Sequence, residues 1–539
     1  MPPFSRRSAL AGLFLTIAAP FAASASTTPP DPSRYPILDD KQLGHVNAIV
    51  RLAGQLNSDW SGMGSDEPGQ GGFDAYRYQL AMMSYTLSLV QYHYTPAYRE
   101  LTQATDARLI DKMLLFDVWG FWELTSRGAK GFDPDLKELG EGWIDPVKRQ
   151  NIMYSGHLFQ MINTHQMLYA DGRYDQPGSI RFVYDPTGRG MGRQDFVYDN
   201  HSLAKVLADQ FRESGWKGIE CEPNAIFPEC NQHPLLGFAL YDRRHGTDYF
   251  KTISAEYRRQ FDQLNYVDPQ TSSFMMMYLI KQEKTLPVQM AWSDGWSGSF
   301  MHAWYKPQVE SLYPVQKAHH LVQLPDGTAT VKATAPSHFY SHDHGFFTLL
   351  AAEVGDTDTR DRMLAYADRY WAPQWRDGAY VFPREDRFKF QGDGSDVWRR
   401  VQPLTGNGLI GLARVNVRDG LHDLFNKPFA DDHFKQPYVS GIGPGGPQVA
   451  RALYDDKEKA LIVTLRPGRA GGASAWTVNN LTPRGSYGLW RDGVRLASLR
   501  KGKLMSDASV PTGALAVGDG SLMVDLPVTS ETSFVLMQE

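Results

Sequence analysis

Cys221 and Cys230 are the only two cysteines in the 539-residue chain, and they stand nine residues apart. A thiol with an ordinary pKa of ~8.5 is mostly protonated at neutral pH, so two thiols in a dry pocket can act as proton donor and proton acceptor when their surroundings shift their pKa values apart. Pro223 and Pro228 interrupt the intervening segment and exclude a helix. We therefore expect a loop to present both sulfurs.

A disulfide is the other chemistry that this pair allows, because an oxidising compartment favours bridges between paired cysteines. Closing so short a loop would add only ~2.5 kcal/mol of stability, which a chain with a large core does not require. Spacing alone leaves three interpretations open: a structural disulfide, a catalytic thiol pair, and two inert thiols.

Two further residues carry side chains suited to proton transfer. His157 lies at helical spacing from Met153 and Met161, so it faces an apolar surface, where a histidine is either a hydrogen-bonded core residue or a general acid-base group. Asp59 follows a predicted helix and precedes a glycine-rich loop, where an aspartate commonly caps a turn. Neither position alone separates a catalytic role from a structural one.

Two other patterns give no support for a metal or a nucleotide. His338, His342 and His344 have a spacing that a metal could use, but no carboxylate-histidine helix motif accompanies them. The loop over residues 62–72 is rich in glycine but lacks the Gly-Lys-Ser/Thr ending of a phosphate-binding loop. We expect a site with no metal and no cofactor.

The elements that must position these residues change along the chain. Over residues 38–435 apolar residues recur mainly at helical spacing, and Gly/Pro/Asp-rich loops separate the helices, which predicts a ring of helix pairs around a central cavity. Over residues 436–539 short alternating segments and Asp-Gly turns predict a small all-β, sandwich-like domain. The expected fold is mainly α, with a toroid-type catalytic domain followed by a β-domain.

The N-terminus predicts export. Paired arginines at Arg6 and Arg7, an apolar run and small residues up to Ser26 are typical of a signal peptide over residues 1–26, here of twin-arginine type. The proline-containing segment 27–37 then predicts a linker. No later stretch has the ~18 consecutive apolar residues of a membrane helix. We expect a periplasmic protein with no integral membrane segment after signal removal.

Composition narrows the class of ligand. The net charge is −5, the pI is about 6.3, and no long Lys/Arg run is present, so nucleic acid is not an expected partner. Aromatic residues make up 12% of the chain, with 13 Trp, which suits the walls of a pocket for an uncharged organic molecule.

Four segments, in this order, resemble the linalool dehydratase/isomerase family of bacterial periplasmic enzymes. They are residues 57–60 (Asn-Ser-Asp-Trp), 151–157 (Asn-Ile-Met-Tyr-x-Gly-His), 221–231 with the two cysteines, and 241–249 (Tyr-Asp-Arg-Arg-His-Gly-Thr-Asp-Tyr). The last string is the most specific, and the resemblance covers about residues 38–420.

The resemblance implies an (α/α)6 toroid, a cofactor-free interconversion of a primary and a tertiary allylic alcohol, dehydration to an alkene, and a homo-oligomer. The catalytic candidates are Asp59, His157, Cys221 and Cys230, and the substrate-binding candidates are Tyr78, Met153, Glu222 and Trp292. Loss of an allylic hydroxyl requires an acid at oxygen, a base for a neighbouring C–H, and an apolar pocket that tolerates a delocalised cation. Our hypothesis is that Asp59 orients His157 while the two cysteines exchange protons on either side of the substrate.

The sequence also departs from the family pattern. Ser65 stands where the family has an active-site tyrosine, and Trp292 aligns with a second pocket tyrosine. The family's further cysteines, which form a separate disulfide, are absent, and the C-terminal β-domain is an addition. These departures leave the identity of the substrate and the subunit arrangement open.

Two other functions compete with an alkenol dehydratase/isomerase. The first is a carbohydrate-active hydrolase or lyase on a helical toroid, which would need two carboxylates across the cavity, such as Glu222 with Asp294 or Asp59, and stacking tryptophans such as Trp292 and Trp296. The second is a non-catalytic periplasmic binding protein in which the cysteines form an ordinary disulfide.

Overall fold

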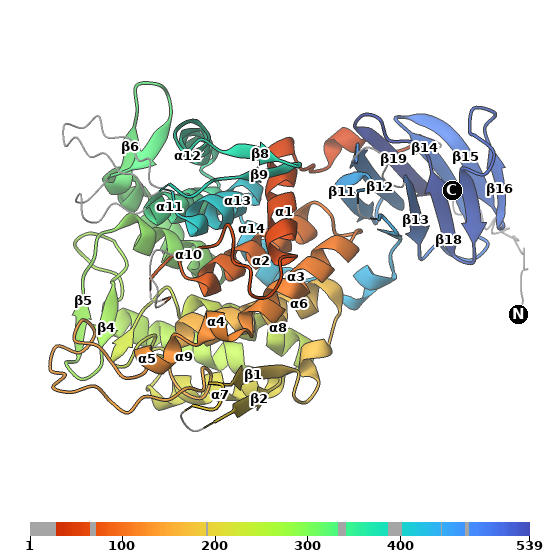
Figure 1. Cartoon of the computed structure of the whole chain (residues 1–539). Helices are drawn as coiled ribbons and strands as arrows, with labels where there is room; N and C mark the ends of the chain where they lie inside the picture. The colour runs from red at the N-terminus through yellow and green to blue at the C-terminus, as the bar shows by residue number, and fades with distance from the viewer. Residues whose placement is uncertain are drawn as a thin grey trace, which may run out of the picture.

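The computed structural model of the chain describes residues 28–64, 70, 72–189, 192–332, 341–385, 401–443, 445–468 and 474–539. The predicted signal peptide, Ser65 and His338 lie outside the described residues. Figure 1 shows a helical part with the C-terminal strands grouped at one end. None of the described helices is both long enough and apolar enough to cross a bilayer.

Helices build the first part of the chain, and side-chain caps explain where some of them begin. Asp39 and Gln42 form a reciprocal capping box at the start of α1, and Asp199 and Ser202 form one at the start of α7. The α-helices are α1 (Asp40–Ala53), α2 (Tyr76–His93), α3 (Glu100–Met113), α4 (Phe116–Trp119), α5 (Trp122–Thr125), α6 (Ile152–Tyr169), α7 (Asn200–Glu213), α8 (Gln232–His245), α9 (Tyr249–Gln263), α10 (Ala291–His320), α11 (Ser341–Glu353), α12 (Thr357–Tyr370), α13 (Ile410–Val415) and α14 (Gly420–Asn426). Shorter helical turns are η1 (Pro32–Arg34), η2 (Arg173–Asp175), η4 (Leu404–Leu409, a π-helix) and η5 (Asp431–Lys435).

Six helical segments contact one another in a closed order. The order is α2, α6, α8, α10, α11 and the η4–α13 segment, which returns to α2. The helices α1, α3, α7, α9 and α12 pack against members of this inner set. Helix α10 bends at Tyr305, whose backbone (φ −134°, ψ 48°) is not helical and which lies two residues before Pro307. Its first half is buried throughout residues 291–303, whereas its second half buries only some positions.

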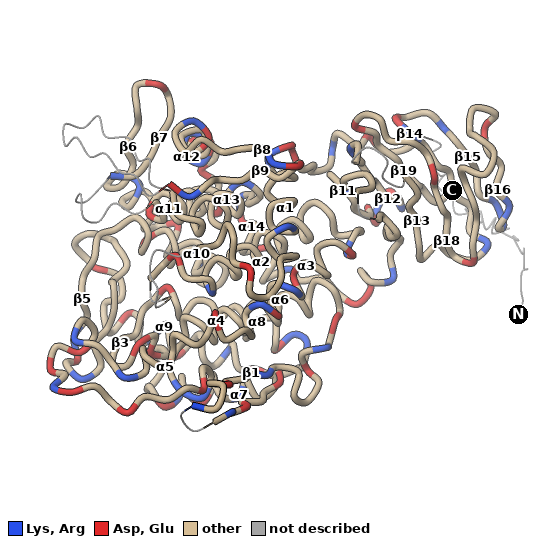
Figure 2. The backbone as a smooth tube through the Cα atoms, viewed as in Figure 1, with Lys and Arg blue, Asp and Glu red and all other residues tan. Residues whose placement is uncertain are grey.

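Burial separates the inner helices from the outer ones. Every residue of α6 except Met167 is buried, and α6 contains no Lys, Arg, Asp or Glu. Outer helix α9 buries only Ile253, Tyr257 and Phe261, four residues apart, as expected for an amphipathic helix on a core. Figure 2 shows charges of both signs interspersed along the chain.

The C-terminal part is built from two antiparallel sheets with a shared apolar core. One sheet has the order β10-β13-β18-β17 and the other β11-β12-β19-β14-β15-β16. Trp476 and Phe534, from different sheets, meet edge to face at 5.2 Å in that core. These strands are β10 (Tyr438–Ser440), β11 (Gln448–Asp455), β12 (Ala460–Arg466), β13 (Ala475–Asn479), β14 (Ser486–Arg491), β15 (Val494–Arg500), β16 (Lys503–Ser506), β17 (Leu515–Gly518), β18 (Ser521–Asp525) and β19 (Thr532–Gln538).

Small hairpins occur in the loops between the helices. Strands β1 and β2 form one of them, β3, β4 and β5 form a three-stranded sheet, and β6–β7 and β8–β9 form two more. Their bounds are β1 (Ile180–Tyr184), β2 (Gln194–Tyr198), β3 (Ala225–Ile226), β4 (Met277–Leu279), β5 (Lys284–Leu286), β6 (Leu321–Gln323), β7 (Ala329–Val331), β8 (Gln374–Arg376) and β9 (Ala379–Val381).

The β-domain is joined to the helices by backbone hydrogen bonds. The N–H of Ala97 donates to the Ala452 carbonyl at 2.9 Å, and the N–H of Ala452 donates to the Tyr94 carbonyl at 3.0 Å. Ala97 and Tyr98, which follow α2, are also buried in the core of the sandwich. The two parts therefore share apolar surface rather than only a linker.

Candidate functional site

A tight loop between α7 and α8 carries both cysteines. The N–H of Cys221 donates to the Ala225 carbonyl at 2.9 Å and closes a turn. The buried Asn231 side chain joins the two ends of the loop: Oδ1 accepts from the Ile219 N–H at 2.7 Å, and Nδ2 donates to the carbonyls of Ile219 at 3.0 Å and Phe227 at 2.9 Å. These buried bonds hold the start and the end of the loop together.

Both cysteines are free thiols in the structure and are buried, at 1% exposure for Cys221 and 3% for Cys230. Burial raises the pKa of each thiol, because a thiolate is poorly solvated there. A hydrogen bond between the two raises the pKa of Cys221 further and lowers that of Cys230. Both thiols are therefore protonated at neutral pH, and the pKa of Cys221 is raised the more of the two.

Two glutamates adjoin the thiols. Glu222 is partly exposed as a residue, but its Oε2 is buried and has no hydrogen-bond partner in the described part of the chain. Glu229 is 2% exposed, and its Oε2 is likewise buried and unpartnered among those residues. Burial raises the pKa of Glu222 to about 7 and that of Glu229 to about 8. At neutral pH Glu229 is therefore mainly a protonated acid.

Arg77 brings a positive charge to this cluster. Its guanidinium carbon lies 4.4 Å from the ring centroid of Tyr78, and its Nη2 lies 3.4 Å from the Tyr78 hydroxyl and 3.5 Å from the Met153 sulfur. Burial is the main cause of the raised pKa values of Glu222 and Cys230, and the positive charge of Arg77 lowers the pKa of both groups. Arg77 thus links the two candidate pocket residues to the thiols electrostatically.

His157 is fully buried on α6 beside this cluster. Its Nδ1 lies 2.9 Å from the Tyr85 hydroxyl, and its ring centroid is 3.7 Å from that of His233 and 5.6 Å from that of Tyr78. Its Nε2 is buried and has no hydrogen-bond partner among the described residues. Burial, with the Arg77 charge acting in the same direction, lowers the pKa of His157 to about 3. The imidazole is therefore neutral at physiological pH.

The neighbouring histidine, His233, has both ring nitrogens engaged. Trp296 Nε1 donates to His233 Nε2 at 2.8 Å. Because an indole N–H is only a donor, His233 carries its proton on Nδ1, which then donates to Gln160 Oε1 at 2.7 Å. His233 is thus a fixed, neutral support for the stacked face of His157.

Asp59 does not orient His157 in this structure. Its Oδ1 accepts the Ser61 N–H at 2.9 Å, in the turn after α1, and bonds to Ser61 lower its pKa. Among the described residues, the hydrogen bonds of His157 include none to Asp59 and one to Tyr85. An Asx turn holds Asp59 locally, and a catalytic role for Asp59 stays a prediction.

Trp292 lies on an aromatic wall that leads to the site. Its ring centroid is 4.7 Å from that of Phe73, which lies 6.1 Å from Trp296. Trp296 in turn meets Tyr78 edge to face at 5.2 Å. The backbone N–H of Trp292 donates to Asp343 Oδ1 at 2.9 Å, which fixes the start of α10. Trp292 is therefore joined to Tyr78 through two other rings.

The histidines around residue 342 do not form a metal centre within the described residues. His344 Nδ1 lies 2.9 Å from the Thr330 hydroxyl, and its Nε2 lies 3.1 Å from the Met363 carbonyl. Both nitrogens are therefore occupied. The groups with metal-like spacing in the described ranges lie elsewhere in the fold.

Asp294, a carboxylate considered for glycan chemistry, is saturated by neighbours. Its oxygens accept from His320 Nε2 at 2.7 Å, the Ser273 hydroxyl at 2.9 Å and the Phe274 N–H at 2.8 Å. It is fully buried, so these bonds serve the packing of α10.

A surface hollow of about 650 Å³ borders the cysteine loop. Its lining includes Glu220, Pro223 and Asn224, and neither cysteine is part of it. The hollow is therefore lined by residues of the loop other than the thiols.

Sequence reasoning missed four groups that contact the candidate residues. Arg77 and Glu229 are next in sequence to Tyr78 and Cys230, and Tyr85 is two helical turns after Tyr78 on α2, so adjacency and helical spacing could have suggested them. His233, at the start of α8, had no such signal because its contacts with α6 and α10 are long-range.

Comparison with known proteins identifies a related family. A family model for linalool dehydratase/isomerase matches residues 77–388, more than half of the chain.

Solved structures with a similar course of the chain are much more distant. Unsaturated glucuronyl hydrolase from Bacillus sp. GL1 is 12% identical with a TM-score of 0.39, covering 71% of this chain and 95% of that one. The α-1,6-mannanase from Salegentibacter sp. HEL1_6 is 10% identical with a TM-score of 0.38, covering 71% and 99%. The Lin0763 protein from Listeria innocua is 10% identical with a TM-score of 0.41, covering 72% and 98%. Similarities of this size carry no functional information.

Proposed function

Because this chain belongs to the linalool dehydratase/isomerase family, we propose that it dehydrates or isomerises a small hydrophobic allylic alcohol by cofactor-free acid-base chemistry. One observation carries the proposal: Cys221 and Cys230 are buried, unbridged and hydrogen-bonded to each other, beside a neutral carboxylic acid and a neutral imidazole. Such a set offers proton donors and acceptors in a dry environment, which is what loss of water from an alcohol requires.

The thiol pair can run the reaction while sharing a single proton. Cys221 donates its proton to the substrate hydroxyl, the C–O bond breaks, and water leaves with the bonding electrons. In the minority of molecules that carry Cys230 as the thiolate, Cys230 removes a proton from the carbon next to the allyl cation and leaves an alkene. Proton transfer from Cys230 back to Cys221 resets the pair. Return of water to the other end of the cation gives the isomeric alcohol instead.

The surrounding side chains support these steps. The Arg77 charge favours the Cys230 thiolate against the burial that opposes it. We assign the departing water to the neutral His157, whose Nε2 is unpartnered among the described atoms. Tyr78, Met153 and the aromatic wall with Trp292 supply apolar and π-rich surface for the allyl cation. Glu222 supplies a carboxyl group with a pKa of about 7 at the edge of the cluster.

The architecture and setting extend the proposal. The closed contact order of inner helices, with the bend that divides α10 in two, supports an (α/α)6 toroid with the site at its inner helices. We further propose export to the periplasm, assembly as a homo-oligomer, and a packing or interaction role for the β-domain. A role for Asp59 in catalysis would then act through its turn after α1, because its bonds here stay with Ser61.

Product analysis tests the function. Purified protein, kept reduced and free of oxygen, is incubated with linalool, geraniol and smaller tertiary alkenols, and alkenes and isomeric alcohols are quantified. Wild type should turn over at least one alkenol, and Cys221→Ser and Cys230→Ser should each abolish turnover while keeping a hydroxyl of similar size. Turnover that survives in both variants, or inertness of the wild type towards every alkenol with turnover of a glycan, would refute the proposal.

A further inference from the structure

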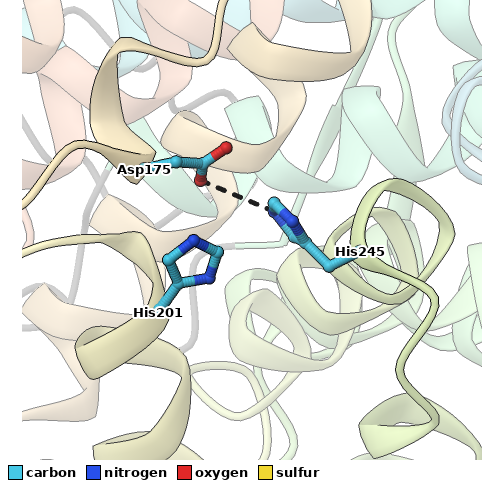
Figure 3. Close-up of side chains that lie close together, drawn as sticks. All are labelled: Asp175, His201 and His245. Carbon is cyan, nitrogen blue, oxygen red and sulfur yellow. Dashed lines mark ion pairs between the residues drawn. The ribbon is translucent and has the colours of Figure 1, made fainter.

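Two histidines and an aspartate converge at the far end of α8 from the thiols. Asp175 ends η2, His201 is the second residue of α7, and His245 is the last residue of α8 (Figure 3). One ligand-type atom from each lies within 4.8 Å of the others. The His245 Nε2 lies 3.5 Å from an Asp175 Oδ1 and is buried without a hydrogen-bond partner in the described chain.

Two of the three side chains are held by a second set of residues. His201 Nδ1 lies 2.8 Å from the Tyr241 hydroxyl, which leaves Nε2 as the nitrogen for another partner. Asn200 Nδ2 donates to Asp175 Oδ1 at 3.1 Å, so the residue before His201 positions the carboxylate. Metal-binding histidines commonly hydrogen-bond through their other nitrogen, and ligating carboxylates are commonly hydrogen-bonded as well. Tyr241 and His245 are one helical turn apart on α8.

We propose that Asp175, His201 and His245 bind one divalent transition-metal ion of the Zn²⁺ class. Imidazole nitrogens together with a single carboxylate suit Zn²⁺, Co²⁺ or Ni²⁺, whereas Ca²⁺ and Mg²⁺ take oxygen-rich sites. His201 is exposed, so the remaining coordination position faces solvent and takes water. Neither the family match nor the thiol chemistry enters this assignment.

A second cluster of similar composition is unsuitable for a metal ion. His302, Glu310 and Asp419 also have ligand atoms within 4.8 Å of one another. There, however, Lys306 Nζ lies 2.7 Å from Asp419 Oδ1 and 3.8 Å from Glu310 Oε1. His302 Nδ1 is bound to Glu353 at 2.9 Å. The ammonium already occupies the position a metal would take, so we assign no ion to this second cluster.

The consequence of metal binding is structural. The ion joins η2, α7 and α8, whose side chains meet at this point. Helix α8 has 14 residues, so His245 lies ~20 Å along its axis from the cysteine end at a rise of ~1.5 Å per residue. Metal binding should therefore stabilise the fold and leave alkenol turnover unchanged.

Calorimetric titration with ZnCl₂ tests the site. The full chain, without a polyhistidine tag and stripped with a chelator, should bind one Zn²⁺, with a rise in Tm of about 2 °C or more in excess metal. His245→Ala and Asp175→Asn should each weaken Zn²⁺ binding at least tenfold. If His245→Ala folds poorly, Asp175→Asn still tests the site, because asparagine has the same shape as aspartate. Tyr241→Phe should weaken it about tenfold, because it removes only the partner of His201.

The control is His422→Ala, which removes a histidine 3.2 Å from Asp423 outside the cluster and should leave Zn²⁺ affinity unchanged. Co²⁺ loading separates this site from the thiols, because thiolate ligation gives an intense near-ultraviolet charge-transfer band that imidazole and carboxylate do not. The proposal would be overturned if the protein binds no Zn²⁺, or if the Zn²⁺ affinity is unchanged in both ligand variants. It would also be overturned if all bound Co²⁺ shows thiolate charge-transfer bands.

Discussion

The Nδ1 nitrogen of His157 lies 2.9 Å from the hydroxyl of Tyr85, across the buried interface between α6 and α2. This contact fixes the ring of a histidine whose other nitrogen is unpartnered in the described structure. The ring also packs against His233, which is held by Trp296 and Gln160. His157 is therefore oriented by Tyr85 and by His233, which Trp296 and Gln160 hold in turn, and none of these four groups is a carboxylate.

Removal of the Tyr85 hydroxyl should reduce activity and stability together. Tyr85→Phe leaves His157 Nδ1 buried without its partner, which costs about 1–3 kcal/mol of unfolding free energy. If His157 holds the departing water, kcat should fall about tenfold or more with little change in KM. Tyr154→Phe is the matched control on α6, because the buried Tyr154 hydroxyl donates to the Met113 carbonyl at 2.7 Å and lies outside the proposed chemistry. Equal kcat losses in both variants would reduce the role of Tyr85 to packing.

The Glu229 carboxyl should set the pH dependence of the thiols. Its pKa of about 8 means that it becomes charged above neutral pH, and that charge raises the pKa of both Cys221 and Cys230. Glu229→Gln should therefore move the rising limb of the kcat/KM profile to lower pH. A profile unchanged from wild type would show that the carboxyl does not act on the reacting thiols.

Ionisation of Glu229 should also lower the free energy of unfolding as the pH rises. Its pKa is about 8 in the folded chain and near 4.5 when unfolded, so between these pH values the folded state binds more protons and the unfolding free energy falls with increasing pH. The decrease is up to about 5 kcal/mol, from ~1.4 kcal/mol per pKa unit. Urea unfolding at pH 5 and pH 8 should show a smaller decrease for Glu229→Gln than for wild type, and Glu220→Gln on the same loop should match wild type.

The Asn231 side chain should keep the two thiols inaccessible to reagents in solution. Asn231→Ala leaves the N–H and carbonyl of Ile219 and the carbonyl of Phe227 unsatisfied, which should lower the unfolding free energy by about 2–4 kcal/mol. The loosened loop should expose the thiols, so their reaction with a disulfide reagent should accelerate at least tenfold and turnover should fall.

Asn163→Ala is the comparison for that variant, since the buried Asn163 bonds Phe159 and Asn200 away from the loop. It should lower stability while leaving thiol reactivity at the wild-type rate. Thiol reactivity that rises equally in both variants would indicate global loosening rather than loss of a specific tie.

Several features were accessible from sequence because they depend on local patterns. Helical spacing placed His157 and Met153 on one helix, and the prolines at 223 and 228 excluded a helix between the cysteines. Alternation and Asp-Gly turns after residue 436 indicated strands, and the structure has its two larger sheets there. The family resemblance, drawn from four short motifs, is confirmed by the match over residues 77–388.

The remaining features depend on contacts between distant residues. Tyr85 and His157 are 72 positions apart, and no local pattern states which side chain will reach a given ring nitrogen. The hypothesis that Asp59 orients His157 rested on the family resemblance, and in the structure Asp59 Oδ1 is bound by the Ser61 N–H in a local turn. Carboxyl pKa values likewise follow from burial, which for Glu229 arises only when the loop folds against α8 and its neighbours.

The redox state of the two cysteines tests the central claim most directly. Protein is prepared fully reduced and fully oxidised with a thiol-specific oxidant, the Cys221–Cys230 bridge is quantified by mass spectrometry, and alkenol turnover is measured on mixtures of known composition. Turnover should be proportional to the fraction of chains with both thiols free, and dithiothreitol should restore it in the oxidised sample. Full turnover by chains that carry the bridge would contradict thiol acid-base catalysis and leave the cysteine pair with a structural role.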